Sequence, residues 1–188
     1  MIQNQFITIP PWRRIRSTPI ADCRVFKVRR DFAEDPRDGS EHDFYCIEAP
    51  DWINVIPLTR DGEVVMIEQY RHGTNEVTLE IPGGMVDEGE SAMITAAREL
   101  REETGYKAEA IRLLGMSRSN PAIQNNWLHT FVATDCVAHE QPQFDSSEHI
   151  AVRLVPLADI RSLIAEGTIN HALVIVAFYF LSNPSNGV

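Results

Sequence analysis

The chain has 188 residues, of which 44% are hydrophobic, and it carries a formal net charge of −10 with a pI near 5.0. This composition indicates a folded globular protein, one domain in size with room for a small appended element. The acidic balance argues against nucleic acid or an anionic membrane surface as a partner, because no basic field is present to attract phosphate polymers.

The cysteines and the apolar segments bear on the cellular compartment. Cys23, Cys46 and Cys136 are too few and too scattered for a disulfide framework or a zinc site, which favours a reducing cytoplasm. The opening residues contain no apolar run after their charges, so no signal sequence is expected. The apolar stretch 172–181 is too short to span a bilayer and predicts a packed terminal helix.

Residues 1–50 are expected to form an N-terminal element. A strand is predicted near Arg14–Pro19, after two prolines. Two further strands, Cys23–Arg30 and Glu41–Glu48, flank a turn-rich segment and predict an antiparallel hairpin or small sheet. Because a hairpin alone is only marginally stable, it must pack on the main domain or on a second copy of the chain.

The main domain is expected over residues 51–188, after a boundary at Pro50. The predicted strands are Ile53–Pro57, Glu63–Tyr70, Glu76–Ile81, Ala110–Ser117, Leu128–Ala133 and His149–Pro156. Helices are expected over Leu157–Glu166 and Ile169–Leu181. Strands on both sides of a central helix predict the α/β (α+β) class, a mixed β-sheet sandwich with helices on both sides.

The central helix is predicted to follow Ser91 and to stop at Gly105. Its mostly apolar face is expected to consist of residues at helical spacing, Met93, Ala96, Ala97, Leu100 and Thr104. A Pro-Gly-Gly turn at 82–84, directly after an apolar strand, precedes this helix. A strand therefore feeds a tight loop and then the helix.

The helix concentrates acid on one side. Glu99 and Glu103 are four residues apart and share a face, while Arg98 and Glu102 have the same spacing and can pair beside them. Backbone carbonyls of the preceding glycines can approach these carboxylates, because no side chain intervenes. Such hard oxygen ligands suit Mg²⁺ or Mn²⁺. The alternative, a solvated helix of Glu and Arg, is usual for a bare glutamate pair, and the glycine turn counts against it.

Residues Gly84 to Tyr106 resemble the Nudix box, in which Gly, five residues, Glu and seven residues precede Arg-Glu-U-x-Glu-Glu-x-Gly-U. Its fixed positions are matched by Gly84, Glu90, Arg98, Glu99, Glu102, Glu103 and Gly105. Tyr106 stands where an aliphatic residue is commoner. The approach to the box at 68–84, Pro121 and the tail from Gly167 resemble the branch of ADP-ribose pyrophosphatases and nucleoside-diphosphate-sugar hydrolases.

This resemblance implies metal-dependent hydrolysis of a nucleoside diphosphate linked to a sugar, with ADP-ribose giving AMP and ribose 5-phosphate. Mg²⁺, or Mn²⁺ in its place, would be held by the Gly83 carbonyl and by Glu99, Glu102 and Glu103, with Arg98 orienting the carboxylates. Glu148 matches a loop glutamate that binds metal or acts as general base in the branch. Ser146 stands where a second acidic residue is usual, so the identity of the base stays open between Glu148 and a box glutamate.

The resemblance also implies substrate-binding residues. Arg71 matches a strand-end arginine that reaches the substrate, where it could pair with a phosphate or stack on a base. A surface arginine of a hairpin is the alternative. Trp52 and Met85 are assigned to substrate binding as well. Phe44 and Tyr45 are further aromatic residues able to sandwich an adenine, although core packing is the commoner fate of such residues.

Other readings stay open. The box recognises a diphosphate and not its substituents, so GDP-mannose, ADP-glucose or a nucleoside triphosphate could be the substrate instead. A non-catalytic nucleotide-sugar sensor is disfavoured, since all the box glutamates are intact. His129 and His171 have no metal-binding spacing and are expected to be structural. A homodimer is expected, because related enzymes exchange their N-terminal hairpins.

Overall fold

The computed structural model describes residues 8–144 and 149–183 of the chain. The chain divides into two compact units, one running up to Ala49 together with Asn120–Asn125, and the other formed by the rest from Pro50 onward. Asn120–Asn125 joins the first unit through backbone hydrogen bonds: Ile47 N donates to Ile123 O over 2.7 Å. The sequence pattern gave no sign of this attachment, because it links segments far apart in the chain.

The first unit contains an antiparallel sheet of three strands, in the order β1 (Arg13–Asp22), β2 (Lys27–Glu34) and β3 (Glu41–Glu48). The predicted small sheet is confirmed, but the predicted start of its second strand at Cys23 is wrong. Cys23 N donates to Phe26 O across a turn, and the strand continues through residues 31–34, which had been expected to turn.

Ion pairs, more than buried apolar side chains, hold this small sheet together. Among the described residues of the unit, Ala33 is the single apolar side chain that is buried. Cross-strand pairs instead join Arg16 to Glu41 over 2.9 Å and Arg30 to Asp43 over 2.8 Å. Exposed pairs of this kind stabilise a fold only modestly. The sheet therefore has little core of its own.

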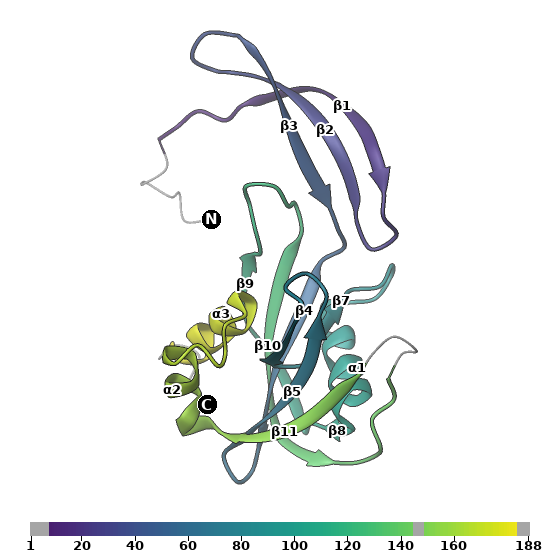
Figure 1. Ribbon diagram of the computed structural model, residues 1–188, viewed down its shortest axis with the longest axis vertical. Coiled ribbons are helices and arrows are strands. Elements are labelled where there is room, and N and C mark those ends of the chain that lie inside the picture. Colours follow the sequence, from purple (N-terminus) through teal and green to yellow (C-terminus); the bar gives the residue numbers. More distant parts are fainter. Residues whose placement is uncertain (1–7, 145–148, 184–188) are drawn as a thin grey trace. The chain divides into compact units, whose positions relative to one another are not determined.

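The second unit is built on a mixed sheet (Figure 1). Its main path is β11 (Ile150–Pro156), β5 (Glu63–Arg71), β4 (Trp52–Thr59), β10 (Trp127–Ala138) and β8 (Tyr106–Lys107). Three further strands pair at its sides: β6 (Glu76–Glu80) with β5, β7 (Gly83–Met85) with β4, and β9 (Ala110–Arg118) with β10. The central pair, β4 and β10, is parallel. The predicted strands are all present, with their ends moved by a few residues.

The glycines at 83 and 84 form a strand and not the predicted turn. Gly83 pairs with Asn54 and Gly84 with Ile53 in antiparallel register. A Cβ on Gly83 would lie 2.6 Å from Ile53 O, so a larger residue could not approach β4 as closely. Strands β7 and β8 were not predicted, because two or three residues are too few to show a periodic pattern.

The central helix α1 (Ala92–Thr104) is present as predicted, with Ser91 as its N-cap and Gly105 at φ 73° as its C-cap. The predicted buried face is wrong in part, because Met93 is 50% exposed and Ala97 is also exposed. The buried residues of the helix are Thr95, Ala96, Leu100, Glu103 and Thr104. Thr95, Glu103 and Thr104 are polar, and they can be buried because their side chains form hydrogen bonds within the protein.

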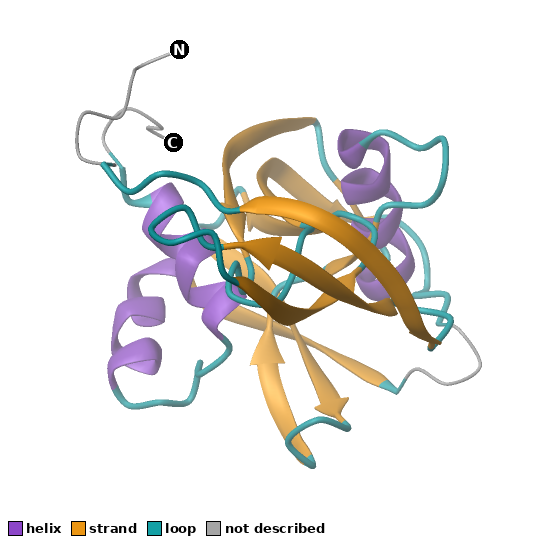
Figure 2. Ribbon diagram, turned by 90° about the horizontal axis from the view of Figure 1, so that it is seen from above, coloured by secondary structure: helices purple, strands orange, loops and turns teal. Residues whose placement is uncertain are grey.

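Helices cover both faces of the sheet, which confirms the predicted sandwich (Figure 2). On one face Leu100 of α1 packs in a cluster with Val55 and Phe131. On the other face α2 (Ile160–Ala165) and α3 (Ala172–Leu181), preceded by the 3₁₀ turn η1 (Leu157–Asp159), cover a cluster that includes Ile56. The last helix begins three residues later than predicted, since Ile169 is fully buried and donates its N–H to Leu163 O.

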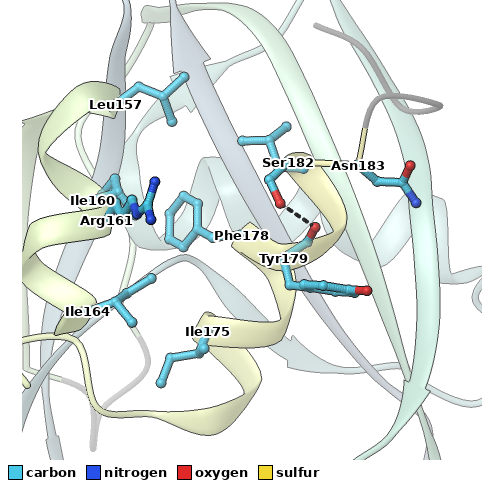
Figure 3. Close-up of a pocket in the computed structure, with 10 residues that line it drawn as sticks. Leu157, Ile160, Arg161, Ile164, Ile175, Phe178, Tyr179, Ser182 and Asn183 are labelled. Carbon is cyan, nitrogen blue, oxygen red and sulfur yellow. Dashed lines mark hydrogen bonds between the residues drawn. The ribbon is translucent and has the colours of Figure 1, made fainter.

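An apolar groove of ≈ 680 Å³ lies along α2 and α3 (Figure 3). Its lining includes Ile160, Phe178 and Tyr179, and Ser182 Oγ at its edge donates to Tyr179 O over 2.8 Å. None of the expected active-site residues that the structure describes lines this groove. Among the helices that the structure describes, none has both the length and the apolar composition needed to cross a membrane.

Candidate active site

The two glycines of β7 meet two glutamates of α1. Gly83 N donates to Glu103 Oε2 over 3.0 Å, and the Glu103 residue is 3% exposed. A Cβ on Gly84 would lie 2.3 Å from Glu99 Oε1, so the carboxylate of Glu99 rests against the bare backbone. The expected proximity of the glycines and the helix carboxylates is therefore present. The contact that the structure shows at Gly83 uses its N–H, whereas the sequence had suggested its carbonyl.

Arg98 lies at the centre of the carboxylates. Its Nη1 donates to Glu99 Oε1 over 2.9 Å and to Glu102 Oε2 over 3.0 Å. Its Nη2 donates to Glu90 Oε2 over 3.2 Å and is 3.5 Å from Asp87 Oδ2. These contacts confirm the pairing of Arg98 with Glu102. They also show that one guanidinium orients several carboxylates at once.

Glu90 lies just before the central helix and is tied to it by hydrogen bonds. Besides its bonds from Arg98, it accepts a hydrogen bond from Thr95 Oγ1 over 2.8 Å. The hydrogen bonds from Arg98, and then that from Thr95, hold the pKa of Glu90 below its usual value. Glu90 therefore stays ionised near neutral pH. It links the loop before α1 to the body of the helix.

The second unit carries the whole acidic excess of the chain. Residues 50–188 contain 9 Lys and Arg against 19 Asp and Glu, whereas residues 1–49 contain 8 of each kind. At the site, Arg98 faces four carboxylates, those of Asp87, Glu90, Glu99 and Glu102. Such a field repels an anionic substrate unless a cation accompanies it.

The donor atoms at this site fit a hard divalent cation. Glu99 and Glu103 present carboxylate oxygens beside β7, and carboxylate oxygens are ligands that Mg²⁺ and Mn²⁺ prefer. Within residues 8–144 and 149–183, no group of three or more His, Cys, Asp or Glu side chains is already arranged to hold an ion. Glu148, the expected further ligand or base, lies outside the described residues, as does Ser146.

Arg71, the expected substrate residue, ends β5 and is bound by Glu80. Its Nε donates to Glu80 Oε1 and its Nη2 to Oε2, each over 2.7 Å. Burial alone would raise the pKa of Glu80, but Arg71, His171 and Thr78 together hold the pKa well below its usual value. Sequence reasoning had missed Glu80. Its only local signal was an acidic residue near the end of a predicted strand, three residues before Gly83.

Trp52 and Met85 lie in one row across the sheet, next to each other on β4 and β7. The same row continues through Leu128 on β10 to Ser117 on β9. Met85 is 38% exposed and Trp52 is half-buried. The two residues expected to bind substrate are therefore neighbours. They share one side of the sheet, because paired residues of adjacent strands point the same way.

Buried polar atoms lie along the same strands. The following described side-chain atoms are buried without a hydrogen-bond partner: Ser117 Oγ, Ser119 Oγ, Asn126 Oδ1 and Nδ2, Thr130 Oγ1 and Asn54 Oδ1. Buried polar groups are nearly always satisfied, so these atoms are exceptions in the interior of the second unit. Sequence reasoning did not find these residues. The density of Ser and Asn between 117 and 126 was a signal for three of them, Ser117, Ser119 and Asn126.

The remaining aromatic and histidine residues have structural contacts. Phe44 and Tyr45 belong to β3 of the first unit, where the Phe44 ring meets Trp12 edge-on at 5.3 Å between centroids. His129 Nε2 is 3.0 Å from Asp51 Oδ2. His171 Nδ1 is 3.3 Å from Glu80 Oε2. A structural role fits His129, while His171 contacts the residue that holds Arg71.

Comparison with known proteins agrees with this site. The sequence model of the NUDIX domain matches residues 50–178. The chain is 29% identical to a methanol dehydrogenase activator of Bacillus methanolicus, over 90% of this chain and 91% of that one. It is 29% identical to an ADP-ribose pyrophosphatase of Bacillus subtilis strain 168, over 72% of this chain and 74% of that one.

A solved structure shares the fold. The crystal structure of an ADP compounds hydrolase superposes with a TM-score of 0.81, covering 93% of this chain and 94% of that one at 23% identity. The family match spans the helix with Glu99 and Glu103, the glycines of β7 and the strands that position them. Sequence, fold and the arrangement of carboxylates thus agree, and the chain belongs to the Nudix family of hydrolases.

Proposed function

We propose that this chain hydrolyses the pyrophosphate bond of a nucleoside diphosphate linked to a sugar, and that ADP-ribose is its substrate. Water attacks one phosphorus, the bond from that phosphorus to the bridging oxygen breaks, and AMP and ribose 5-phosphate are released. The contact of Glu99 and Glu103 with the bare backbone of Gly83 and Gly84 carries the proposal. An ADP-ribose pyrophosphatase among the relatives supports the choice of substrate.

The carboxylates are proposed to hold Mg²⁺ or Mn²⁺, since Nudix hydrolases generally need divalent metal ions. Glu99, Glu102, Glu103 and the Gly83 carbonyl would supply ligands, and a bound ion would neutralise the diphosphate and acidify a water molecule. Arg98 holds three of the glutamates in place through the contacts described above. Glu148 is proposed as a further ligand or as the general base.

The substrate side is proposed to consist of Arg71, Trp52 and Met85. The guanidinium of Arg71 is 42% exposed as a side chain and is held by Glu80, so it can present a fixed positive charge to a phosphate. Trp52 and Met85 are neighbours that offer an aromatic ring and a thioether to a base or ribose.

A panel assay tests the choice of substrate. Purified protein with Mg²⁺ is given ADP-ribose, ADP-glucose, GDP-mannose and a nucleoside triphosphate at equal concentration, and phosphate-bearing products are separated by ion exchange. We expect the highest kcat/KM with ADP-ribose and the products AMP and ribose 5-phosphate. Faster turnover of GDP-mannose, ADP-glucose or a triphosphate would assign the chain to that activity instead. Tight binding of ADP-ribose without turnover would indicate a sensor.

A homodimer is also proposed, formed through the first unit as a dimerisation element. The sheet β1-β2-β3 has almost no buried apolar side chain, yet it exposes Trp12, Phe44 and Tyr45. An isolated small sheet with exposed aromatic residues needs a covering partner. Sedimentation at micromolar concentration should give twice the chain mass, and a monomer would exclude the idea.

The free cysteines Cys23, Cys46 and Cys136 fit the proposed cytoplasmic location.

A further inference from the structure

A buried carboxylate joins Arg71 to the last helix. Glu80 ends β6, is 2% exposed and receives two hydrogen bonds from the Arg71 guanidinium. Thr78 Oγ1 donates to the same carboxylate over 2.5 Å, and His171 Nδ1 lies 3.3 Å from it. Two parallel hydrogen bonds fix the plane of a guanidinium as well as its position. Glu80 therefore restrains Arg71 more tightly than a single ion pair would.

His171 is an unusual residue for its place in the fold. It is the N-cap of α3, where Ser, Thr, Asp or Asn normally accepts a hydrogen bond from the first turn. Its side chain makes no capping hydrogen bond, and its ring lies beside Glu80 instead. The start of α3 is tied to the sheet by Asn54 Nδ2, which donates to Leu173 O over 2.8 Å. The contact with Glu80 explains a histidine here better than helix capping does.

The side chains of Glu80, His171 and Arg71 differ in how far they are exposed to solvent. The Glu80 side chain is 3% exposed, that of His171 is 36% exposed and that of Arg71 is 42% exposed. A buried carboxylate is unfavourable unless charged and polar partners satisfy it, so Glu80 holds its partners firmly. Arg71, at the end of β5, is the most exposed of the three, and Glu80 is the buried residue that holds it.

We propose that Glu80 and His171 are positioning residues that keep the Arg71 guanidinium in the orientation that meets the substrate diphosphate. This inference rests on the proposed function, in which Arg71 binds the diphosphate. Glu80 acts through Arg71, and His171 acts through Glu80; neither touches the substrate. A preordered arginine loses little side-chain freedom when the substrate binds, so affinity depends on these residues more than turnover does.

The kinetics of single and double variants test whether Glu80 acts through Arg71. E80Q should raise KM for ADP-ribose about tenfold and H171S about fourfold, with kcat within about twofold, because interactions made equally in ground and transition states change KM alone. In an R71A background, E80Q should raise KM no further, since residues that act through one another are not additive. An equal further rise in that background would show that Glu80 does not act through Arg71.

The substitution His171→Ser separates positioning from stability. Serine is a favoured N-cap residue, so the melting temperature should stay within about 2 °C of the wild-type value. Its hydroxyl ends one bond nearer the backbone than the His171 Nδ1 that contacts Glu80, so the contact is lost and KM should rise all the same. His129→Ser is the matched control, because His129 also contacts a carboxylate, that of Asp51, but not one that holds Arg71. Its KM should equal that of the wild type.

An NMR measurement tests the inference without substrate. The Arg71 Nε–H should give a resolved ¹H–¹⁵N signal that exchanges slowly, identified by its loss in R71K. E80Q should abolish or shift this signal, and H171S should speed its exchange at least about threefold, whereas H129S should leave it unchanged. An unchanged signal in H171S would refute the role of His171. Should the wild type fail to hydrolyse ADP-ribose, the proposed function falls, while this signal still decides the positioning.

Discussion

Glu99 occupies the space that a side chain on Gly84 would need. A Cβ on Gly84 would lie 2.3 Å from Glu99 Oε1 and 2.6 Å from its Cδ, and both atoms belong to the mobile end of a long side chain. The clash can therefore be relieved by turning Glu99 away, without moving the backbone. Glycine at this position serves the placement of the carboxylate more than the stability of the fold.

Gly84→Ala should separate activity from stability. The added methyl displaces the Glu99 carboxylate, so kcat/KM should fall at least about tenfold, while the melting temperature changes by less than about 3 °C. Gly73→Ala is the matched control, because nothing lies within 4 Å of a Cβ there. Activity and thermal unfolding of both variants check the prediction. A fully active G84A protein would show that the position of Glu99 does not matter.

Glu103→Gln should abolish turnover and keep the fold. Glutamine still offers an oxygen to the Gly83 N–H but removes the charge that a cation requires. We expect kcat to fall about a thousandfold or more, with little change in thermal stability. Glu88→Gln removes an exposed carboxylate of the preceding loop and should retain full activity. Near-normal turnover by E103Q would remove Glu103 from the proposed site.

Mg²⁺ should stabilise the protein through the same carboxylates. A ligand at a hundred times its Kd adds about 2.7 kcal/mol to the free energy of unfolding, which corresponds to a rise of several degrees in melting temperature. The rise should be reversed by EDTA and should be much smaller in E99Q and E103Q. Differential scanning fluorimetry during a Mg²⁺ titration measures it. An identical rise in E99Q would place the ion elsewhere.

Glu80 should make the stability of the protein depend on pH in acid. Its pKa in the folded state is lowered, so its contribution is present above the unfolded-state pKa and is lost as the pH falls through the folded-state pKa. E80Q should therefore unfold more easily at pH 7, by about 3 kcal/mol, and this deficit should shrink below about pH 4. Urea unfolding of the wild type and of E80Q, from pH 7 to below pH 4, measures this deficit. A deficit that is constant with pH would contradict an ionised Glu80.

Gly105→Ala should destabilise the fold strongly. Gly105 has φ 73°, and a Cβ there would lie 2.1 Å from the backbone oxygen of Glu140, which cannot turn aside as a side chain does. We expect a loss of about 3 kcal/mol or more. Gly167→Ala is the control, because Gly167 has φ 81° but nothing within 4 Å of a Cβ. That variant should lose only about 1 kcal/mol, from backbone strain alone.

Much of the fold followed from local patterns in the sequence. The strands from β4 to β11 were predicted where alternating or apolar runs were long enough to show a period, and Ser91 and Gly105 marked the ends of α1. The short strands β7 and β8 carry no such period. The buried face of α1 was misjudged, because Thr95 and Glu103 are polar residues that can be buried through hydrogen bonds with Glu90 and with Gly83.

Only part of the candidate site, like part of the fold, could be predicted from the sequence. The spacing of Glu99, Glu103 and Arg98 along one helix was readable, because a helix fixes the geometry of residues four apart. The contact of Glu80 with His171 could not be predicted from the sequence, since it joins a strand to a helix much later in the chain. The unpartnered polar atoms along β9 and β10 depend equally on strand pairing. Long-range contacts of this kind leave no local pattern.

The division of charge described above means that dissolved salt acts on the two units in opposite directions. Screening relieves the mutual repulsion within residues 50–188, where acids outnumber bases by 19 to 9. The same screening weakens the cross-strand pairs, such as Arg16 with Glu41, on which the sheet β1-β2-β3 depends. A rise in ionic strength should therefore lower the stability of the first unit and raise that of the second.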